Sequence, residues 1–187
     1  MSRIPVHTID DAPASTGPAL AKLAGRTGKL LNIHAEMAHA PVVLAAYTGL
    51  SAAIAEHGSF DARVREAIAL AVANVDGCEY CQAAHTLSAQ KAGFDQAQTV
   101  AIRGGVVGFD DRLAALLAVV REAAGNVGEV GDDTWRAASA AGWSDTELAE
   151  AFAHLAANLF TNYFNHYART ELDVPAAPAL PGEPAAD

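Results

Sequence analysis

Hydrophobic positions recur along the chain at the three- and four-residue spacing of α-helices, and no segment alternates convincingly with a period of two. The clearest helix follows Asp61, where the apolar positions are Val64, Ala67, Ile68, Ala71, Val72 and Val75. Other helices are expected over residues 20–34 (broken near Gly25 and Gly28), 41–56, 78–93, 95–103, 111–124, 132–141 and 144–170. The pattern predicts an all-α, single-domain helical bundle of about seven to eight helices.

Residues that begin and end helices support these boundaries. Asp61 is a good N-cap, and Ser144 with Glu147 three residues later has the sequence of a capping box. Gly77 is expected to let the chain turn sharply between one helix and the next, which begins at Cys78.

Both ends of the chain lack a sustained period. Residues 1–17 are rich in Pro, Asp, Ser, Thr and Gly, and residues 173–187 are mostly Pro, Ala and Gly with acidic residues. We expect a flexible N-terminal arm over 1–17, a helical domain over 18–172 and a disordered tail over 173–187.

Composition and charge narrow the class of protein. A chain of 187 residues with 51% hydrophobic residues suits one domain with a substantial core. The net charge of −10 argues against a nucleic-acid partner, because no basic patch stands out. No stretch has the length and apolar character of a membrane span or a signal peptide, so we expect a cytoplasmic protein with no membrane partner. Its two cysteines are then expected to be reduced, without a structural disulfide.

The segment from Glu66 to His85 carries the candidate chemistry. Cys78 and Cys81 are three residues apart and His85 follows four residues later, so all three can share one face of a helix. The cysteines fall in the first turn, where unpaired N–H groups and the helix dipole favour a thiolate over a thiol of ordinary pKa about 8.5. The pattern predicts a nucleophilic sulfur.

Three interpretations of the cysteine pair remain open on the residues alone. The cysteines could be small buried hydrophobes, although three reactive side chains on one face argue against coincidence. They could bind zinc, but the chain has no second cysteine pair, and Glu66 or another histidine would have to complete the site. A redox dithiol fits best, because a vicinal pair can form and release a short disulfide; it needs neither metal nor cofactor.

The spacing of the wider motif resembles a known family. Glu66, eleven intervening residues, a C-x-[HY]-C segment and a histidine four residues later resemble the signature of the alkyl hydroperoxidase D (AhpD-like) branch of the carboxymuconolactone decarboxylase family. The matching residues are Glu66, Cys78, Tyr80, Cys81 and His85. The flanks at 39–41 and 91–93 are also similar, and the resemblance spans about residues 18–170.

The resemblance implies a fold, an activity and partners. It implies an all-helical subunit that forms trimers, dimers or hexamers, and a thiol-dependent peroxidase that reduces hydrogen peroxide or alkyl hydroperoxides. Cys81 would attack the peroxide, Cys78 would donate a proton and resolve the sulfenic acid, and Glu66 and His85 would relay protons. A lipoyl-bearing protein or a thioredoxin-like dithiol carrier would restore the dithiol.

Two positions modify these expectations. The helix dipole alone favours Cys78 as the more acidic thiol, whereas His85, one turn beyond Cys81, favours Cys81. Tyr80 replaces a histidine found in some relatives, and a phenol of pKa about 10 is no base at neutral pH, although it can donate a hydrogen bond. Its part in the relay is left open.

Two other functions are compatible with the sequence. One is a carboxymuconolactone decarboxylase-type lactone enzyme, against which the cysteine pair argues. The other is a redox adaptor or sensor that exchanges disulfides with a protein partner. A polar stripe at four-residue steps in the last helix is expected to face a subunit interface rather than a pocket: His154, Asn158, Asn162 and His166.

Overall fold

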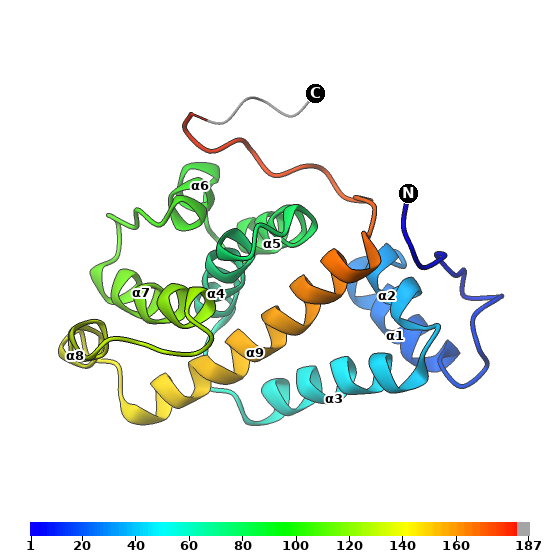
Figure 1. Cartoon of the computed structure of the whole chain (residues 1–187), viewed down its shortest axis with the longest axis horizontal. Helices are drawn as coiled ribbons and strands as arrows, with labels where there is room; N and C mark the ends of the chain where they lie inside the picture. Colours follow the sequence, from blue (N-terminus) through cyan, green and yellow to red (C-terminus); the bar gives the residue numbers. More distant parts are fainter. Residues whose placement is uncertain (183–187) are drawn as a thin grey trace.

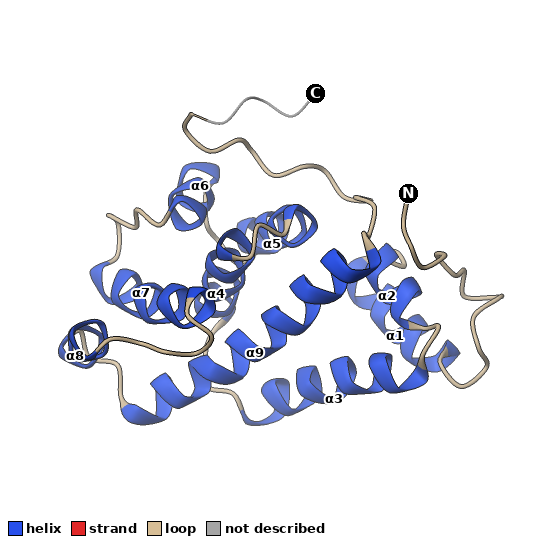
Figure 2. Cartoon of the chain, in the orientation of Figure 1, coloured by secondary structure: helices blue, strands red, loops and turns tan. Residues whose placement is uncertain are grey.

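The computed structural model describes residues 1–182, which contain nine α-helices and no strand (Figure 1, Figure 2). The helices are α1 (Gly17–Thr27), α2 (Asn32–Met37), α3 (Pro41–His57), α4 (Ala62–Val75), α5 (Glu79–Lys91), α6 (Gln96–Gly104), α7 (Asp111–Gly125), α8 (Asp132–Ala140) and α9 (Asp145–Ala168). The all-α fold predicted from the sequence is confirmed.

The helix boundaries follow the capping residues. The Asp61 side chain accepts the Val64 N–H at 2.9 Å, and Ser144 and Glu147 form a complete capping box at the start of α9. The helix expected over residues 20–34 is two helices, because Gly28 adopts a left-handed conformation (φ +84°) and ends α1. This break raises the number of helices in the described residues above the seven to eight expected.

Helix α4 lies at the centre of the fold. Its residues from Ala67 to Ala73 are all buried, because α5, α6, α7 and α9 pack around it. This explains why the α4 sequence is nearly continuously apolar rather than amphipathic. Glu66, just before the buried run, is one of the few ionisable residues of this helix.

The buried side chains form two clusters. The larger one lies between α4 and the helices from α6 to α9, and the smaller one joins α1, α2 and α3 to Tyr80, Cys78 and Cys81. Helix α9 crosses the molecule beside both α3 and α4 (Figure 1). The two cysteines therefore lie where the smaller cluster meets the central helices.

The chain after α9 has no helix or strand up to residue 182 and passes over α5 toward α6 (Figure 1). Asp173 contacts Tyr80, and Arg103 donates to the carbonyl of Pro178. Residues 183–187 of the expected tail lie outside the described residues. None of the helices within residues 1–182 is long and apolar enough to cross a membrane.

Candidate active site

The turn between α4 and α5 places Cys78 at the positive end of α5. Gly77 has a φ of +63°, which confirms the sharp turn expected there and which glycine adopts without steric cost. Cys78 is the N-cap of α5, and its Sγ accepts the Cys81 N–H at 3.2 Å. Both thiols are reduced and buried. A sulfur in this position compensates an unpaired N–H group at the helix start.

The two thiols differ in acidity. A hydrogen bond from the Cys81 thiol lowers the pKa of Cys78 to about 7, against the opposing effect of burial and with help from the Cys81 N–H and Asn165. Burial and the neighbouring Cys78 sulfur raise the pKa of Cys81. Cys78 is thus the more acidic thiol of the pair, as the helix dipole alone suggests, and Cys81 keeps its proton more tightly.

Asn165 of α9 is a functional candidate that sequence analysis missed. Its Nδ2 donates to Cys81 Sγ at 3.1 Å and lies 3.8 Å from Cys78 Sγ. Asn165 is 84 residues from Cys81, and it falls outside the regular polar stripe of α9, so no local spacing connects it with the cysteines. Its amide stabilises negative charge on either sulfur.

We expect the thiol titration to depend on Asn165. In the wild type, alkylation of Cys78 by iodoacetamide should accelerate as the pH rises through about 7, since the thiolate forms above its pKa. Asn165→Leu removes the donor at similar volume and should move the midpoint upward by up to about one pH unit. Peptide mass spectrometry measures the rate between pH 5 and 9.

The matched control is Asn158→Leu, because Asn158 is also a buried asparagine of α9 but donates to the His154 carbonyl. Its midpoint should stay at the wild-type value. Equal midpoints in all three proteins would show that Asn165 does not act on the sulfurs.

Glu66 and His85 form the second half of the site. The Nδ1 of His85 donates to Glu66 Oε2 at 2.8 Å, and the two side chains are 29% and 24% exposed. Burial lowers the pKa of His85, but the hydrogen bond and charge of Glu66, with the charge of Cys78, raise the pKa above its usual value. Glu66 and the Cys78 sulfur therefore favour the imidazolium form of His85.

His85 influences the two cysteines through its charge rather than through a direct contact. Among the described residues, His85 makes no hydrogen bond to either sulfur, and its electrostatic partner in the pair is Cys78. A proton passing between His85 and the thiols therefore needs a bridging molecule, such as water or the substrate.

Tyr80 is directed to the C-terminal segment. Its hydroxyl donates to Asp173 Oδ1 at 2.6 Å, and burial and the Asp173 carboxylate raise its pKa. Asp173 is also held by Lys29 at 3.2 Å and by the backbone N–H of Asn32. Tyr80 is thus a neutral phenol that fastens residue 173 over the start of α5.

Tyr80→Phe should therefore lower the stability of the fold and have a smaller effect on the reactivity of the thiols. Loss of a buried hydrogen bond to a carboxylate is expected to lower the free energy of unfolding by about 1–2 kcal/mol, measured by urea titration. Tyr163→Phe, at a 59% exposed position, is the control and should change it little. Slower alkylation of Cys78 in Tyr80→Phe at unchanged stability would instead show that Tyr80 acts on the thiols.

Three of the four residues in the polar stripe of α9 are buried within the chain itself. Asn162 donates to the Asp76 carboxylate at 2.7 Å, His166 bonds the Asp76 carbonyl at 2.9 Å, and His154 stacks on Phe60. The expectation that this stripe faces a subunit interface is wrong for His154, Asn158 and Asn162, whose side chains are buried in the chain's own core. Asn162 and His166 hold the turn that leads into Cys78.

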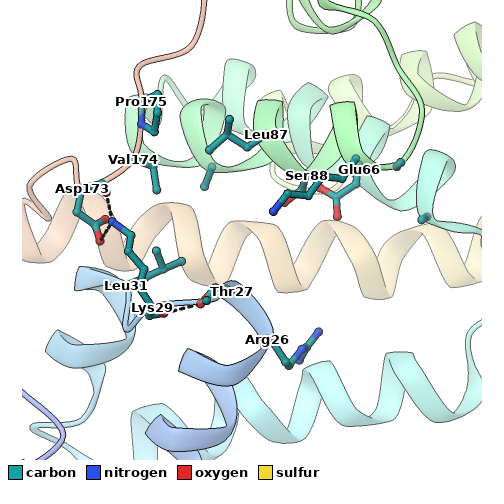
Figure 3. A pocket seen from close by; sticks show the side chains of 15 residues that line it. Arg26, Thr27, Lys29, Leu31, Glu66, Leu87, Ser88, Asp173, Val174 and Pro175 are labelled. Atoms are coloured by element: carbon teal, nitrogen blue, oxygen red, sulfur yellow. Dashed lines mark hydrogen bonds and ion pairs between the residues drawn. The ribbon is translucent and has the colours of Figure 1, made fainter.

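Metal ligands are not clustered in the described part of the chain: no three His, Cys, Asp or Glu side chains of residues 1–182 could hold an ion together. A pocket of about 620 Å³ lies beside the site, between the α1–α2 connection on one side and α4 and α5 on the other (Figure 3). Glu66 lines this pocket, and residues 173–175 close one end.

Part of the chain matches a known protein family. Residues 41–124 match the carboxymuconolactone decarboxylase family, and this segment contains both cysteines, Glu66 and His85. No curated protein matches the chain.

Solved structures share the fold over almost the whole chain. A peroxidase-related protein with an alkylhydroperoxidase AhpD core from Ralstonia eutropha has a TM-score of 0.82 and 19% identity, with 92% of each chain covered. A variant of the debrominase Bmp8 in complex with 2,3,4-tribromopyrrole has a TM-score of 0.79 and 18% identity, again with 92% of each chain covered. A peroxidase-related protein from Silicibacter has a TM-score of 0.76 and 17% identity, with 90% of this chain and 89% of that chain covered.

The fold and the site thus define an all-helical protein of AhpD-like architecture with a reduced cysteine pair. The segment that holds the site matches the carboxymuconolactone decarboxylase family, as the sequence resemblance predicts, and the solved structures show that the chain has the fold of AhpD-like proteins.

Proposed function

We propose that this chain is a thiol-dependent peroxidase that reduces hydrogen peroxide or alkyl hydroperoxides by cycling Cys78 and Cys81 between dithiol and disulfide. One observation carries the proposal: an acidic Cys78 at a helix N-terminus accepts hydrogen bonds from Cys81, beside an ion pair of Glu66 and His85. A nucleophile, a proton acceptor and a proton donor then stand in one site.

The acidity of the two thiols suits an attack by Cys81. The Cys78 thiolate takes the Cys81 proton as Cys81 sulfur attacks one peroxide oxygen and the O–O bond breaks. Cys81 becomes a sulfenic acid, and the leaving alkoxide receives that proton from Cys78 and departs as the alcohol. The low pKa of Cys78 thus supports its role as proton carrier rather than contradicting an attack by Cys81.

The second half of the cycle forms the disulfide. The Cys78 thiolate attacks Cys81 sulfur, the S–O bond breaks, and the departing hydroxide takes a proton from the His85 imidazolium and leaves as water. The dithiol has then lost two electrons, and the peroxide has become an alcohol and water. Glu66 raises the pKa of His85 and so favours the protonated imidazole that donates this proton.

The proposal also includes a protein reductant, a cytoplasmic location and self-association. A lipoyl-bearing or thioredoxin-like dithiol protein would reduce the disulfide, as the family resemblance implies, and the reducing cytoplasm suits such a cycle. We also propose that the chain associates with further copies of itself. Large exposed hydrophobic side chains on α3 and α9 support a subunit interface on these helices: Val42, Phe152, Tyr163 and Tyr167.

Stopped-flow thiol oxidation by hydrogen peroxide and by cumene hydroperoxide, with mass spectrometry of the product, tests this function. We expect loss of two thiols per peroxide and a Cys78–Cys81 disulfide that a dithiol reductant reopens. Thiols that stay reduced with excess of both peroxides would refute it.

The same protein preparation separates the other candidates. A redox adaptor would react slowly with both peroxides but exchange disulfides quickly with a protein dithiol. A lactone enzyme would consume a dicarboxylate lactone, also with both cysteines alkylated. A dehalogenase, suggested by the fold shared with the debrominase, would release bromide from a bromopyrrole.

A further inference from the structure

The pocket beside the site has two unlike ends. One face of α5 lines its length with Ala84, Leu87, Ser88 and Lys91, at helical steps of three and four residues. At one end Ala84 and Leu31 pack against the cluster that contains both cysteines. Val174 and Pro175 add apolar surface there (Figure 3).

The other end is cationic. Arg26 of α1 lies across the pocket from Glu66 and Ser88 (Figure 3), and Lys91 lies one turn beyond Ser88. Within residues 1–182 the side chains of Arg26 and Lys91 make no ion pair or hydrogen bond, although the chain carries a net charge of −10. The remaining charges of the pocket are already matched, Lys29 by Asp173 and Glu66 by His85.

We propose that this pocket binds an organic hydroperoxide that carries a carboxylate, with the carboxylate at Arg26 and Lys91 and the apolar chain along Leu87. The hydroperoxide group then lies at the Leu31–Ala84 end, where the lining of the pocket packs against the cluster that contains the cysteines. This inference rests on the peroxidase function proposed above and names the class of its substrate.

The dimensions of the pocket define the substrate further. Ten residues of helix separate Cys81 from Lys91, which corresponds to about 15 Å along α5. An extended chain of about ten to twelve methylene groups spans this length. A pocket of about 620 Å³ also has the size of known small-molecule sites. Hydroperoxides of long-chain fatty acids combine a carboxylate, a chain of this length and a peroxide.

The kinetic test compares a linoleic acid hydroperoxide with its methyl ester below their micellar concentrations, with hydrogen peroxide as a substrate too small to use the cationic end. The free acid should oxidise the thiols about five- to tenfold faster at low concentration, as two exposed ion pairs allow, and this preference should shrink in high salt. In Arg26→Gln/Lys91→Gln the acid and the ester should react equally, while the rate with hydrogen peroxide stays unchanged. Lys22→Gln, an exposed lysine of α1 outside the pocket, should keep the preference.

A binding test separates this inference from the peroxidase function. Laurate, which has no peroxide group, should bind the wild type more tightly than dodecanol by calorimetry, and about five- to tenfold more tightly than it binds Arg26→Gln/Lys91→Gln. Thiols that react with hydrogen peroxide but show no preference for acid over ester, together with no laurate binding, would overturn the inference and leave the peroxidase function standing. Laurate binding that depends on Arg26 and Lys91, with thiols inert to every peroxide, would support the carboxylate site and refute the peroxidase function.

Discussion

Cys81→Ser is expected to lower peroxide consumption by more than about a thousandfold, because the hydroxyl of serine cannot replace the attacking sulfur. Cys78→Ser should also lose turnover with a dithiol reductant, since no second thiol remains to form the disulfide. Cys78→Ser differs from Cys81→Ser in one respect. Its Cys81 still reacts with peroxide, and the resulting sulfenic acid persists because no second thiol attacks it. Labelling with dimedone, followed by mass spectrometry, should therefore mark Cys81 in Cys78→Ser and leave Cys81→Ser unlabelled.

The roles of the two cysteines can be distinguished by this labelling. If dimedone marks Cys78 in Cys81→Ser and nothing in Cys78→Ser, then the thiol of lower pKa is the attacking one and the roles are reversed. Full activity in both single variants would eliminate the dithiol mechanism. Unfolding curves of the two variants serve as the control, because both cysteines are buried beside Asn165 and the comparison requires equal folding.

Glu66→Gln is expected to slow peroxide reduction by about a hundredfold. Glu66 raises the pKa of His85 against the effect of burial, so its removal should leave a histidine whose pKa lies below the wild-type value. Less imidazolium is then present at neutral pH, and the hydroxide released during disulfide formation loses its proton donor. The remaining activity should shift toward lower pH, where His85 is protonated again.

Two measurements check this prediction. The titration of His85 followed by NMR should show a lower midpoint in Glu66→Gln than in the wild type, and stopped-flow traces should give the loss of rate. Glu79→Gln removes the same charge from an exposed position at the start of α5 and should leave the His85 midpoint near the wild-type value. A similar shift in both variants would mean that net charge, rather than the Glu66–His85 hydrogen bond, controls the histidine.

Helix positions were the most predictable part of this protein. The Asp61 cap, the Ser144–Glu147 box and the Gly77 turn lie where the sequence predicts them, since each depends on residues within one helical turn of one another. The two-helix break at Gly28 was expected only as an interruption, because a glycine marks a possible helix end but not whether the chain resumes as a new helix.

The sequence predicted the residues of the candidate site, but not all of the contacts between them. The spacing of Cys78, Cys81 and His85 follows from α5 alone, and the structure keeps them on one helix. The hydrogen bond between His85 and Glu66 joins two helices, and only the family resemblance had connected those residues in advance. The polar stripe of α9 was assigned to an interface because spacing shows that residues share a face, but not what covers that face.

The sequence alone determined the helices, the place of Cys78 at a helix start and the residues of the motif, because all three depend on residues close along the chain. Only the tertiary structure decided that Asn165 bonds the sulfurs, that Tyr80 fastens Asp173, and that Arg26 and Lys91 share a pocket. These contacts join segments far apart in the sequence. They depend on how the helices pack around α4, a global balance of buried surface that no local pattern records.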